Sequence, residues 1–243
     1  MKSSKLNLIK LAKTAINEHK NWGENEIFAD KEISKPDMGK LKEQKRVQSA
    51  GELLEIFRKK ICDCKKCSLG KTRLNFVFGV GNPNAEIMFV GEGPGFQEDH
   101  KGEPFIGRAG ALLDKIIEAM GHTRQSVYIA NIVKCHPMKD PTNPELTNND
   151  RPPTQEEMAT CKSYLDKQIE IITPKVIITL GSSSTRCLLN TEETISNLRG
   201  KFKIYNGIKL MPTFHPAALL RNPNLKKDTW QDMKEVLAYL KQR

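Results

Sequence analysis

The spacing of apolar residues constrains this chain more than any other feature of its sequence. Short, continuous apolar runs that are typical of strands occupy residues 86–90, 127–133, 176–180 and 209–214. Segments with the periodicity of amphipathic helices alternate with them, at residues 51–61, 109–120, 154–172 and 228–241. Strands that are apolar on both faces belong to parallel sheets covered by helices on both sides. We therefore predict an α/β fold, a three-layer α/β/α sandwich around a central, mainly parallel four-stranded sheet.

Unusual segments follow three of these predicted strands. They are the glycine-rich G-E-G-P-G at residues 91–95, the segment 131–135, and the H-P-A-A at residues 215–218. Ligands of parallel sheets bind outside the carboxyl ends of the strands. We therefore expect the three segments to form one active site. The polar, Pro- and Asn-rich residues 137–151 predict a surface loop.

Two carboxylates lie in or near the glycine-rich turn at residues 91–95. The turn is not a phosphate loop, because it lacks the Gly-Lys-Ser/Thr ending, and its spacing differs from the dinucleotide motif G-x-G-x-x-G. Its backbone amides can approach a ligand closely, while Glu92 and Glu98 point into one cleft. Two acids there could orient water and stabilise a developing cation. The alternative is a tight turn with solvated acids.

An amide, an aromatic ring and an imidazole accompany these acids. Asn131 ends a buried strand, and its side chain offers the donor and acceptor pair that reads one edge of a nucleobase. Phe105 could stack on a base, or it could be an ordinary core residue. His215 could donate to a developing oxyanion, or it could cap the following segment. Arg221 suits contacts to backbone phosphates.

The sequence also contains a C-K-K-C motif and two distant cysteines, a candidate four-thiolate set of Cys64, Cys67, Cys135 and Cys161. A C-x-x-C turn presents two thiolates to a zinc ion or an iron–sulfur cluster. The alternatives are a redox pair or buried unpaired thiols. Cys62 could compete as a ligand, whereas Cys187 fits a buried helix position.

Composition narrows the partners and the compartment. The formal net charge of +10 favours a polyanion, with nucleic acid first, and 38% hydrophobic residues suffice for a large core. No run approaches the ~20 apolar residues of a membrane span, and no secretion signal is evident, so we expect a cytoplasmic protein, nucleoid-associated if prokaryotic. Residues 1–50 are expected to form a basic extension or linker before a domain at 51–243.

The motifs jointly resemble family 4 uracil-DNA glycosylases, the iron–sulfur branch of the uracil-DNA glycosylase superfamily. The matching stretches span roughly residues 61 to 240: C-K-K-C-S-L-G-K-T-R, V-G-E-G-P-G-F-Q-E-D, G-E-P-F-I-G-R-A-G, Y-I-A-N-I-V-K-C-H-P, R-P-P-T-Q-E-E-M-A-T-C and T-F-H-P-A-A-L-L-R-N. The interval between the last two cysteines is longer than is usual for the family, by about residues 138–150. Its loop contains no histidine, which argues against the covalent uracil-trapping branch of the superfamily.

The resemblance implies a ligand set for a [4Fe-4S] cluster: Cys64, Cys67, Cys135 and Cys161. It also implies that Glu92 lies against C5 of the base and excludes the thymine methyl, with Gly93 in the same substrate-binding turn. Glu98 would position water or balance charge at the sugar.

The resemblance further implies that Phe105 stacks on the base, that Asn131 reads it, and that His215 faces uracil O2. Leu219 or Leu220 would fill the gap left in the duplex, and a DNA-binding role is implied for Arg221 as well.

The expected activity is that of a monomeric, monofunctional glycosylase. It would flip uracil out of single- or double-stranded DNA, hydrolyse the N-glycosidic bond and leave an abasic site. The chief alternative is a non-catalytic nucleic-acid-binding module with an iron–sulfur or zinc staple. A nucleotide or phosphate-ester hydrolase is a second alternative, but the sequence has neither a phosphate loop nor a carboxylate cluster for a metal.

Overall fold

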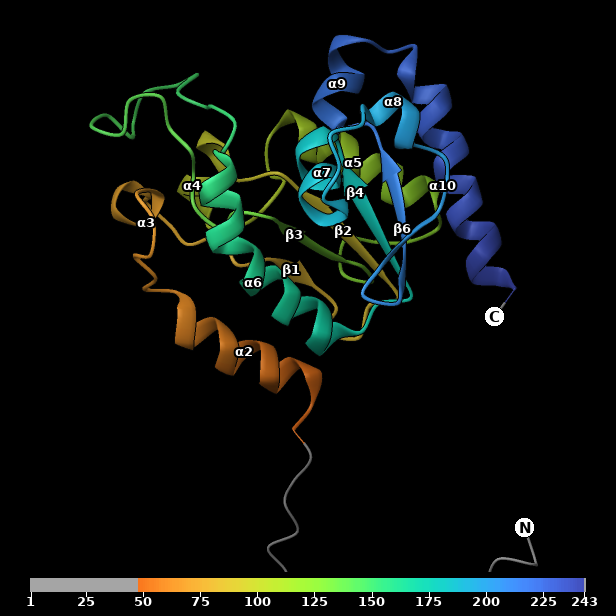
Figure 1. Ribbon diagram of the computed structural model, residues 1–243, viewed down its shortest axis with the longest axis horizontal. Helices are drawn as coiled ribbons and strands as arrows, with labels where there is room; N and C mark the ends of the chain where they lie inside the picture. The colour runs from red at the N-terminus through yellow and green to blue at the C-terminus, as the bar shows by residue number, and fades with distance from the viewer. Residues whose placement is uncertain (1–47, 243) are drawn as a thin grey trace, which may run out of the picture. The chain divides into compact units, whose positions relative to one another are not determined.

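A computed structural model describes residues 48–242, which contain one mixed sheet with the strand order β1-β3-β2-β4-β6-β5 (Figure 1). Its four central strands run parallel: β2 (Ile87–Gly91), β3 (Tyr128–Asn131), β4 (Val176–Leu180) and β6 (Ile208–Thr213). These are the four strands that the sequence predicts. Two short antiparallel edge strands widen the sheet beyond that prediction, β1 (Val80–Gly81) and β5 (Lys203–Tyr205).

Several of the main helices have well-defined caps. Serine or threonine begins α2 (Ala50–Ile61) and α6 (Gln155–Ile172), each with a glutamate three residues later in a reciprocal capping box. Helix α5 (Arg108–Ala119) ends before Gly121, whose φ of +81° suits glycine. The last helix, α10 (Leu225–Lys241), starts three residues earlier than predicted.

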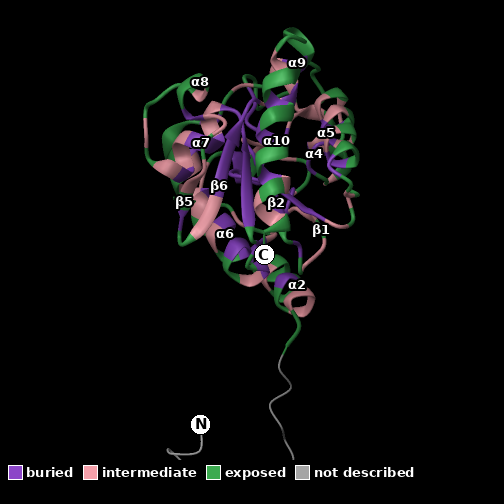
Figure 2. Ribbon diagram, turned by 90° about the vertical axis from the view of Figure 1, so that its right-hand side faces the viewer, coloured by how far each residue is buried: buried purple, intermediate pink, exposed green. Residues whose placement is uncertain are grey.

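Helices cover both faces of the sheet, so the predicted three-layer arrangement is confirmed. Within β2, Met88 and Val90 pack into the hydrophobic cluster beneath α2, α6 and α7 (Ser182–Leu189). Ile87 and Phe89, which alternate with them, pack into a second cluster with α5 and α10. Figure 2 shows the buried strands between these helical layers. Because both faces are covered, the central strands are mostly apolar on both sides.

Short helices follow the carboxyl ends of the strands: α4 (Phe96–Lys101) after β2, α7 after β4 and α9 (Pro216–Arg221) after β6. Two more lie elsewhere, α3 (Leu69–Thr72) after the C-K-K-C motif and α8 (Ile195–Leu198) after α7. Figure 1 shows α7, α8 and α9 gathered at one end of the sheet. Because β2, β4 and β6 run parallel, the connections into α4, α7 and α9 leave from the same edge of the sheet.

The predicted basic extension, residues 1–50, lies almost entirely outside the described residues. The loop at residues 137–151 forms no helix and is pinned by a bridge between Met138 and Asp150. Within residues 48–242, we find no helix with the length and apolar character that crossing a bilayer requires.

Candidate active site

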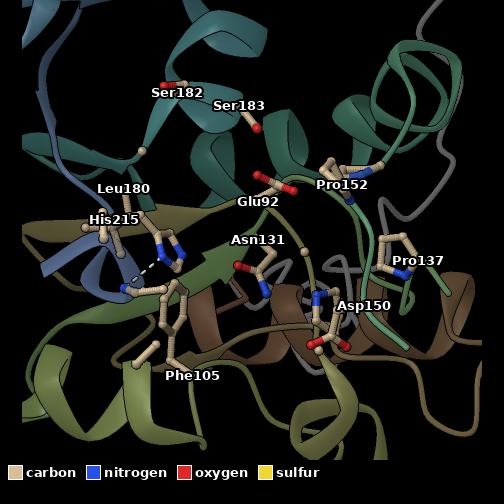
Figure 3. A pocket seen from close by; sticks show the side chains of 18 of the residues that line it. Glu92, Phe105, Asn131, Pro137, Asp150, Pro152, Leu180, Ser182, Ser183 and His215 are labelled. Carbon is tan, nitrogen blue, oxygen red and sulfur yellow. Dashed lines mark hydrogen bonds between the residues drawn. The ribbon is translucent and has the colours of Figure 1, made fainter. Parts of the chain in front are cut away.

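A cavity of about 590 Å³ opens at the carboxyl ends of the parallel strands (Figure 3). The turns after β2, β4 and β6 and the end of β3 form its walls. The sequence-predicted site residues that line it are Glu92, Gly93, Glu98, Phe105, Asn131, His215 and Arg221. The structure thus brings together side chains from four separate segments, and their individual roles remain predictions.

Asn131 is buried with an unused hydrogen-bonding atom. It is the last residue of β3 and 2% exposed, and its Oδ1 has no hydrogen-bond partner among the described residues. A Cβ on the neighbouring Gly91 would lie 2.4 Å from that oxygen and 2.5 Å from Cζ of Phe105. An unsatisfied buried acceptor costs about 1–3 kcal/mol. Oδ1 of Asn131 is therefore a buried acceptor that no described group satisfies.

Phe105 occupies a strained backbone conformation beside this amide. Its φ is +55°, a left-handed value that costs a non-glycine residue on the order of 1–3 kcal/mol. Arg124 holds it there by donating to the Phe105 carbonyl at 3.2 Å and to the carbonyl of Pro104. Gly110 leaves room for that carbonyl, since a Cβ would approach it to 1.9 Å. Arg124 was not among the predicted site residues, because it belongs to no recognisable motif.

His215 caps helix α9 and lies 5.7 Å from the ring centroid of Phe105. Its Nδ1 accepts the Ala217 N–H at 3.1 Å, so in the neutral ring the proton is on Nε2 (Figure 3). Burial lowers the pKa of His215 to about 4, and the Arg221 guanidinium contributes in the same direction. The imidazole is therefore neutral at ordinary pH and can donate from Nε2.

The two predicted acids differ in how they are held. Glu98 accepts three backbone N–H groups, from Gly95 at 3.1 Å, Ile106 at 2.9 Å and Gly107 at 3.1 Å. This carboxylate joins two loops at the cavity wall and has a structural role whatever else it does. Within residues 48–242, the Glu92 side chain forms no hydrogen bond, and it lines the same cavity (Figure 3).

The loop at residues 137–151 contributes to the cavity. Its sequence predicted only a surface loop. Asp150 lines the wall, accepts the Phe96 N–H at 3.2 Å and lies 2.7 Å from Nε2 of His136. The hydrogen bond from His136 lowers the pKa of Asp150. A third carboxylate therefore reaches the site from what looked like a surface loop.

The two leucines assigned to the duplex gap have different environments. Leu219 is 1% exposed and packs in the protein interior, so its side chain cannot enter a duplex from this conformation. Leu220 is 39% exposed. The prediction therefore narrows to Leu220, beside the exposed Arg221 at the end of α9.

The four cysteines of the candidate metal site converge on one hydrophobic cluster. Cys135 and Cys161 are buried in it, and Cys64 and Cys67 pack against it. The thiol of Cys62 instead donates to a carbonyl of α2 at 3.5 Å. In the described part of the chain, no three His, Cys, Asp or Glu residues are grouped so as to hold a metal ion.

Hydrogen bonds from neighbouring side chains reach two of these thiols. Four cysteine thiolates are the ligand set of a structural zinc ion and of an iron–sulfur cluster alike. Arg73 donates to Sγ of Cys135 at 3.4 Å, and the Tyr164 hydroxyl donates to Sγ of Cys64 at 3.2 Å. Burial raises the pKa of Cys135 to about 12, so only a bound metal would hold it as a thiolate at ordinary pH.

Comparison with known proteins decides the family. Residues 78–241 match the model of the family described as "Uracil DNA glycosylase superfamily". The chain belongs to this superfamily. A "Type-4 uracil-DNA glycosylase" of Sulfurisphaera tokodaii is 43% identical to it, over 75% of this chain and 83% of the relative. A "Type-4 uracil-DNA glycosylase" of Thermotoga maritima is 40% identical, over 78% of this chain and 96% of the relative. A "Type-5 uracil-DNA glycosylase" of Pyrobaculum aerophilum is 28% identical, over 65% and 71%, so this member of the superfamily resembles the type-4 group more.

Proposed function

We propose that this superfamily member is a DNA-repair uracil-DNA glycosylase, which extrudes uracil from DNA and hydrolyses its N-glycosidic bond to leave an abasic site. The observation that carries the proposal is the unpaired, buried Oδ1 of Asn131, with an aromatic ring and a neutral imidazole in the same cavity. The similarity to the type-4 relatives gives independent support.

Base recognition would use the polar atoms that the free protein leaves unpaired. The N3–H of uracil is a donor and its O4 an acceptor, which match Oδ1 and Nδ2 of Asn131. Stacking on Phe105 would add roughly 1–3 kcal/mol. Together these contacts would offset the few kcal/mol needed to extrude the base from the duplex.

Specificity against thymine would come from Glu92. Its side chain lines the cavity on the wall formed by the G-E-G-P-G turn and would lie against C5 of the base. Thymine differs from uracil by the methyl group at C5, and excluding one methyl group is worth about 1–3 kcal/mol in a fitted pocket. Gly93 keeps this turn close to the opposite wall, because a Cβ there would lie 2.6 Å from the side chain of Val133.

Bond cleavage would separate a positively charged sugar from a uracil anion. The Nε2–H of His215 would donate to O2 of the leaving base, where negative charge develops, without the ring losing its proton. Glu98, which three amides already fix in place, would stabilise the sugar cation or orient the attacking water. Fixed groups of this kind need little reorganisation during the reaction.

DNA contacts would extend beyond the base. Leu220 is the exposed residue that could fill the space left in the duplex, and Arg221 would contact phosphate. The net charge of +10 favours a polyanionic substrate. Both single- and double-stranded DNA would be substrates, and the enzyme would act as a monomer.

The cofactor would be a [4Fe-4S] cluster held by the candidate ligands Cys64, Cys67, Cys135 and Cys161. The convergence of these thiols on one hydrophobic cluster and the hydrogen bonds from Arg73 and Tyr164 support a centre with four thiolate ligands. When bound, the cluster supplies a crosslink between distant parts of the chain, with no redox part in the hydrolysis. Arg73 also donates to the carbonyls of Cys62 and Cys64, at 2.6 and 2.7 Å, and so supports this segment.

A gel assay tests the proposed activity. The protein is incubated with uracil-containing single- and double-stranded oligonucleotides, which are then treated with alkali. A glycosylase yields strand cleavage only after alkali, and thymine-containing controls remain intact. A non-catalytic binding module would shift the oligonucleotides in a native gel without creating alkali-labile sites, and that result would contradict the proposal.

A further inference from the structure

A lysine side chain is fully buried between the cysteine set and the candidate active site. Lys134 is 0% exposed, and its Nζ donates to the main-chain oxygen of Asn131 at 2.8 Å and to Oε1 of Gln168 at 2.6 Å. Gln168 is itself fixed by donating to the carbonyl of Phe78 at 2.9 Å and the hydroxyl of Tyr128 at 3.2 Å. Lys134 therefore has a defined position and is bonded to the main chain of Asn131, the residue whose side chain is proposed to read the base.

The charge of this ammonium group lacks a carboxylate partner among the described residues. Buried charges are costly unless an opposite charge compensates them. Burial lowers the pKa of Lys134 to about 8, and the nearby thiols of Cys161 and Cys135 act in the opposite direction. The main-chain N–H of Lys134 lies against the thiol of Cys161. Four thiolates around a metal centre carry more negative charge than the two positive charges of a zinc ion or an oxidised four-iron core. A centre of this kind would compensate the ammonium.

We propose that Lys134 is a counter-cation of the four-cysteine centre, in addition to Arg73, and a positioning residue for Asn131. This inference rests on the proposed cofactor. The ammonium group would act on the thiols through its charge, and it holds the carbonyl of Asn131 through a hydrogen bond. The cluster and the base-reading amide are thereby connected by a side chain as well as by the intervening main chain.

The charge and the hydrogen bond can be separated with three variants of the cluster-containing enzyme. Lys134→Arg keeps the charge, Lys134→Gln keeps a donor but removes the charge, and Lys134→Met removes both. The midpoint potential of the cluster is the readout for charge, because loss of a nearby cation disfavours an added electron. We expect more negative potentials in the Gln and Met variants and a nearly unchanged potential in the Arg variant. Faster iron release to a chelator should accompany the negative shift.

Excision kinetics provide the readout for positioning. Lys134→Met should lower kcat more than Lys134→Gln does, because only glutamine can still donate to Asn131. Lys66→Met is the matched control: this exposed lysine lies 5.2 Å from the Tyr164 ring, near the cysteines, where solvent screens its charge. The control should leave both potential and kcat close to those of the wild type.

Two results would overturn the inference. Equal midpoint potentials and equal iron retention in the three Lys134 variants would show that the ammonium does not compensate the centre. Equal kcat in Lys134→Met and Lys134→Gln would remove its positioning role. If the neutral variants purify without iron while Lys134→Arg retains it, the requirement for charge is supported directly. A wild-type protein without iron would refute the cofactor itself, and this would be evident before any variant is compared.

Discussion

The unpaired oxygen of Asn131 makes a prediction that links stability to activity. In the free protein this buried acceptor has no partner within residues 48–242, which costs about 1–3 kcal/mol. Asn131→Ala removes the acceptor together with its cost, and the space opens into an existing cavity. We therefore expect the free energy of unfolding to stay the same or to rise by up to about 2 kcal/mol, even though a nearly fully buried side chain is truncated.

Asn149 provides a matched control of the same residue type and similar burial. It is 1% exposed, and its side chain accepts the Asp140 N–H at 2.8 Å and donates to the carbonyls of Asp140 at 2.8 Å and Asn143 at 3.1 Å. Each such hydrogen bond contributes roughly 0.5–1.5 kcal/mol, so Asn149→Ala should cost roughly 2–4 kcal/mol. In a chain of this size each kcal/mol shifts the melting temperature by roughly 2–4 °C.

Thermal unfolding and single-turnover excision would be measured on both variants. Asn131→Ala should melt at or slightly above the wild-type temperature, while kcat/KM on uracil-containing DNA falls about 5- to 150-fold, as expected for a lost bidentate contact worth about 1–3 kcal/mol. Asn149→Ala should show a clearly lower melting temperature. If Asn131→Ala were destabilised as much as Asn149→Ala, the amide would be satisfied in the free protein and the argument for a poised base reader would fail.

Three further predictions address the imidazole, the cysteines and the strained turn. Because the pKa of His215 is about 4, excision should show no titration of this group between pH 5 and 8. Because the pKa of His215 is lower in the folded protein, the unfolded protein takes up this proton first as the pH drops. The free energy of unfolding should therefore fall from about pH 6.5 toward 4. This fall should be absent in His215→Gln, and identical pH profiles of unfolding in the variant and the wild type would contradict the prediction. Cys64→Ala should abolish the brown colour of an iron–sulfur protein while Cys62→Ala retains it, as judged by visible absorbance and iron content. Arg124→Met should raise KM and lower the melting temperature, because the left-handed conformation of Phe105 loses its support; unchanged values of both would show that the turn holds itself.

The central fold could be predicted because its signals are local and mutually consistent. The four parallel strands are short, mostly apolar runs, and the capping box at Thr154 marks one helix start. The edge strands were missed because β1 has two residues and β5 has three, too few to show a period. One signal was available: Asn206-Gly207, with φ values of +47° and +81°, forms the tight hairpin turn between β5 and β6.

The candidate site could be predicted in part for a related reason. The topology of a parallel sheet places strand ends together, so Glu92, Asn131 and His215 could be grouped without knowing any distance. Contacts made by side chains across the fold leave no sequence period. Arg124 reaches the backbone of Phe105 from beyond α5, and Asp150 reaches the cavity from an irregular loop. Neither could be inferred from spacing alone.

The short distance between Asn131 and Cys135 suggests how loss of the cluster would act. Four residues of extended chain span at most about 14 Å, so the base-reading amide lies close to a proposed ligand along the main chain. The segment also bonds to the walls on either side: the N–H of Val133 donates to the carbonyl of Glu92 at 3.1 Å, and the N–H of Val77 donates to the carbonyl of Lys134 at 2.9 Å. The second hydrophobic cluster, which packs the other face of the sheet against α5 and α10, contains none of the cysteines. Removing the cluster should therefore loosen this segment by local unfolding, and excision should fail while most of the fold remains.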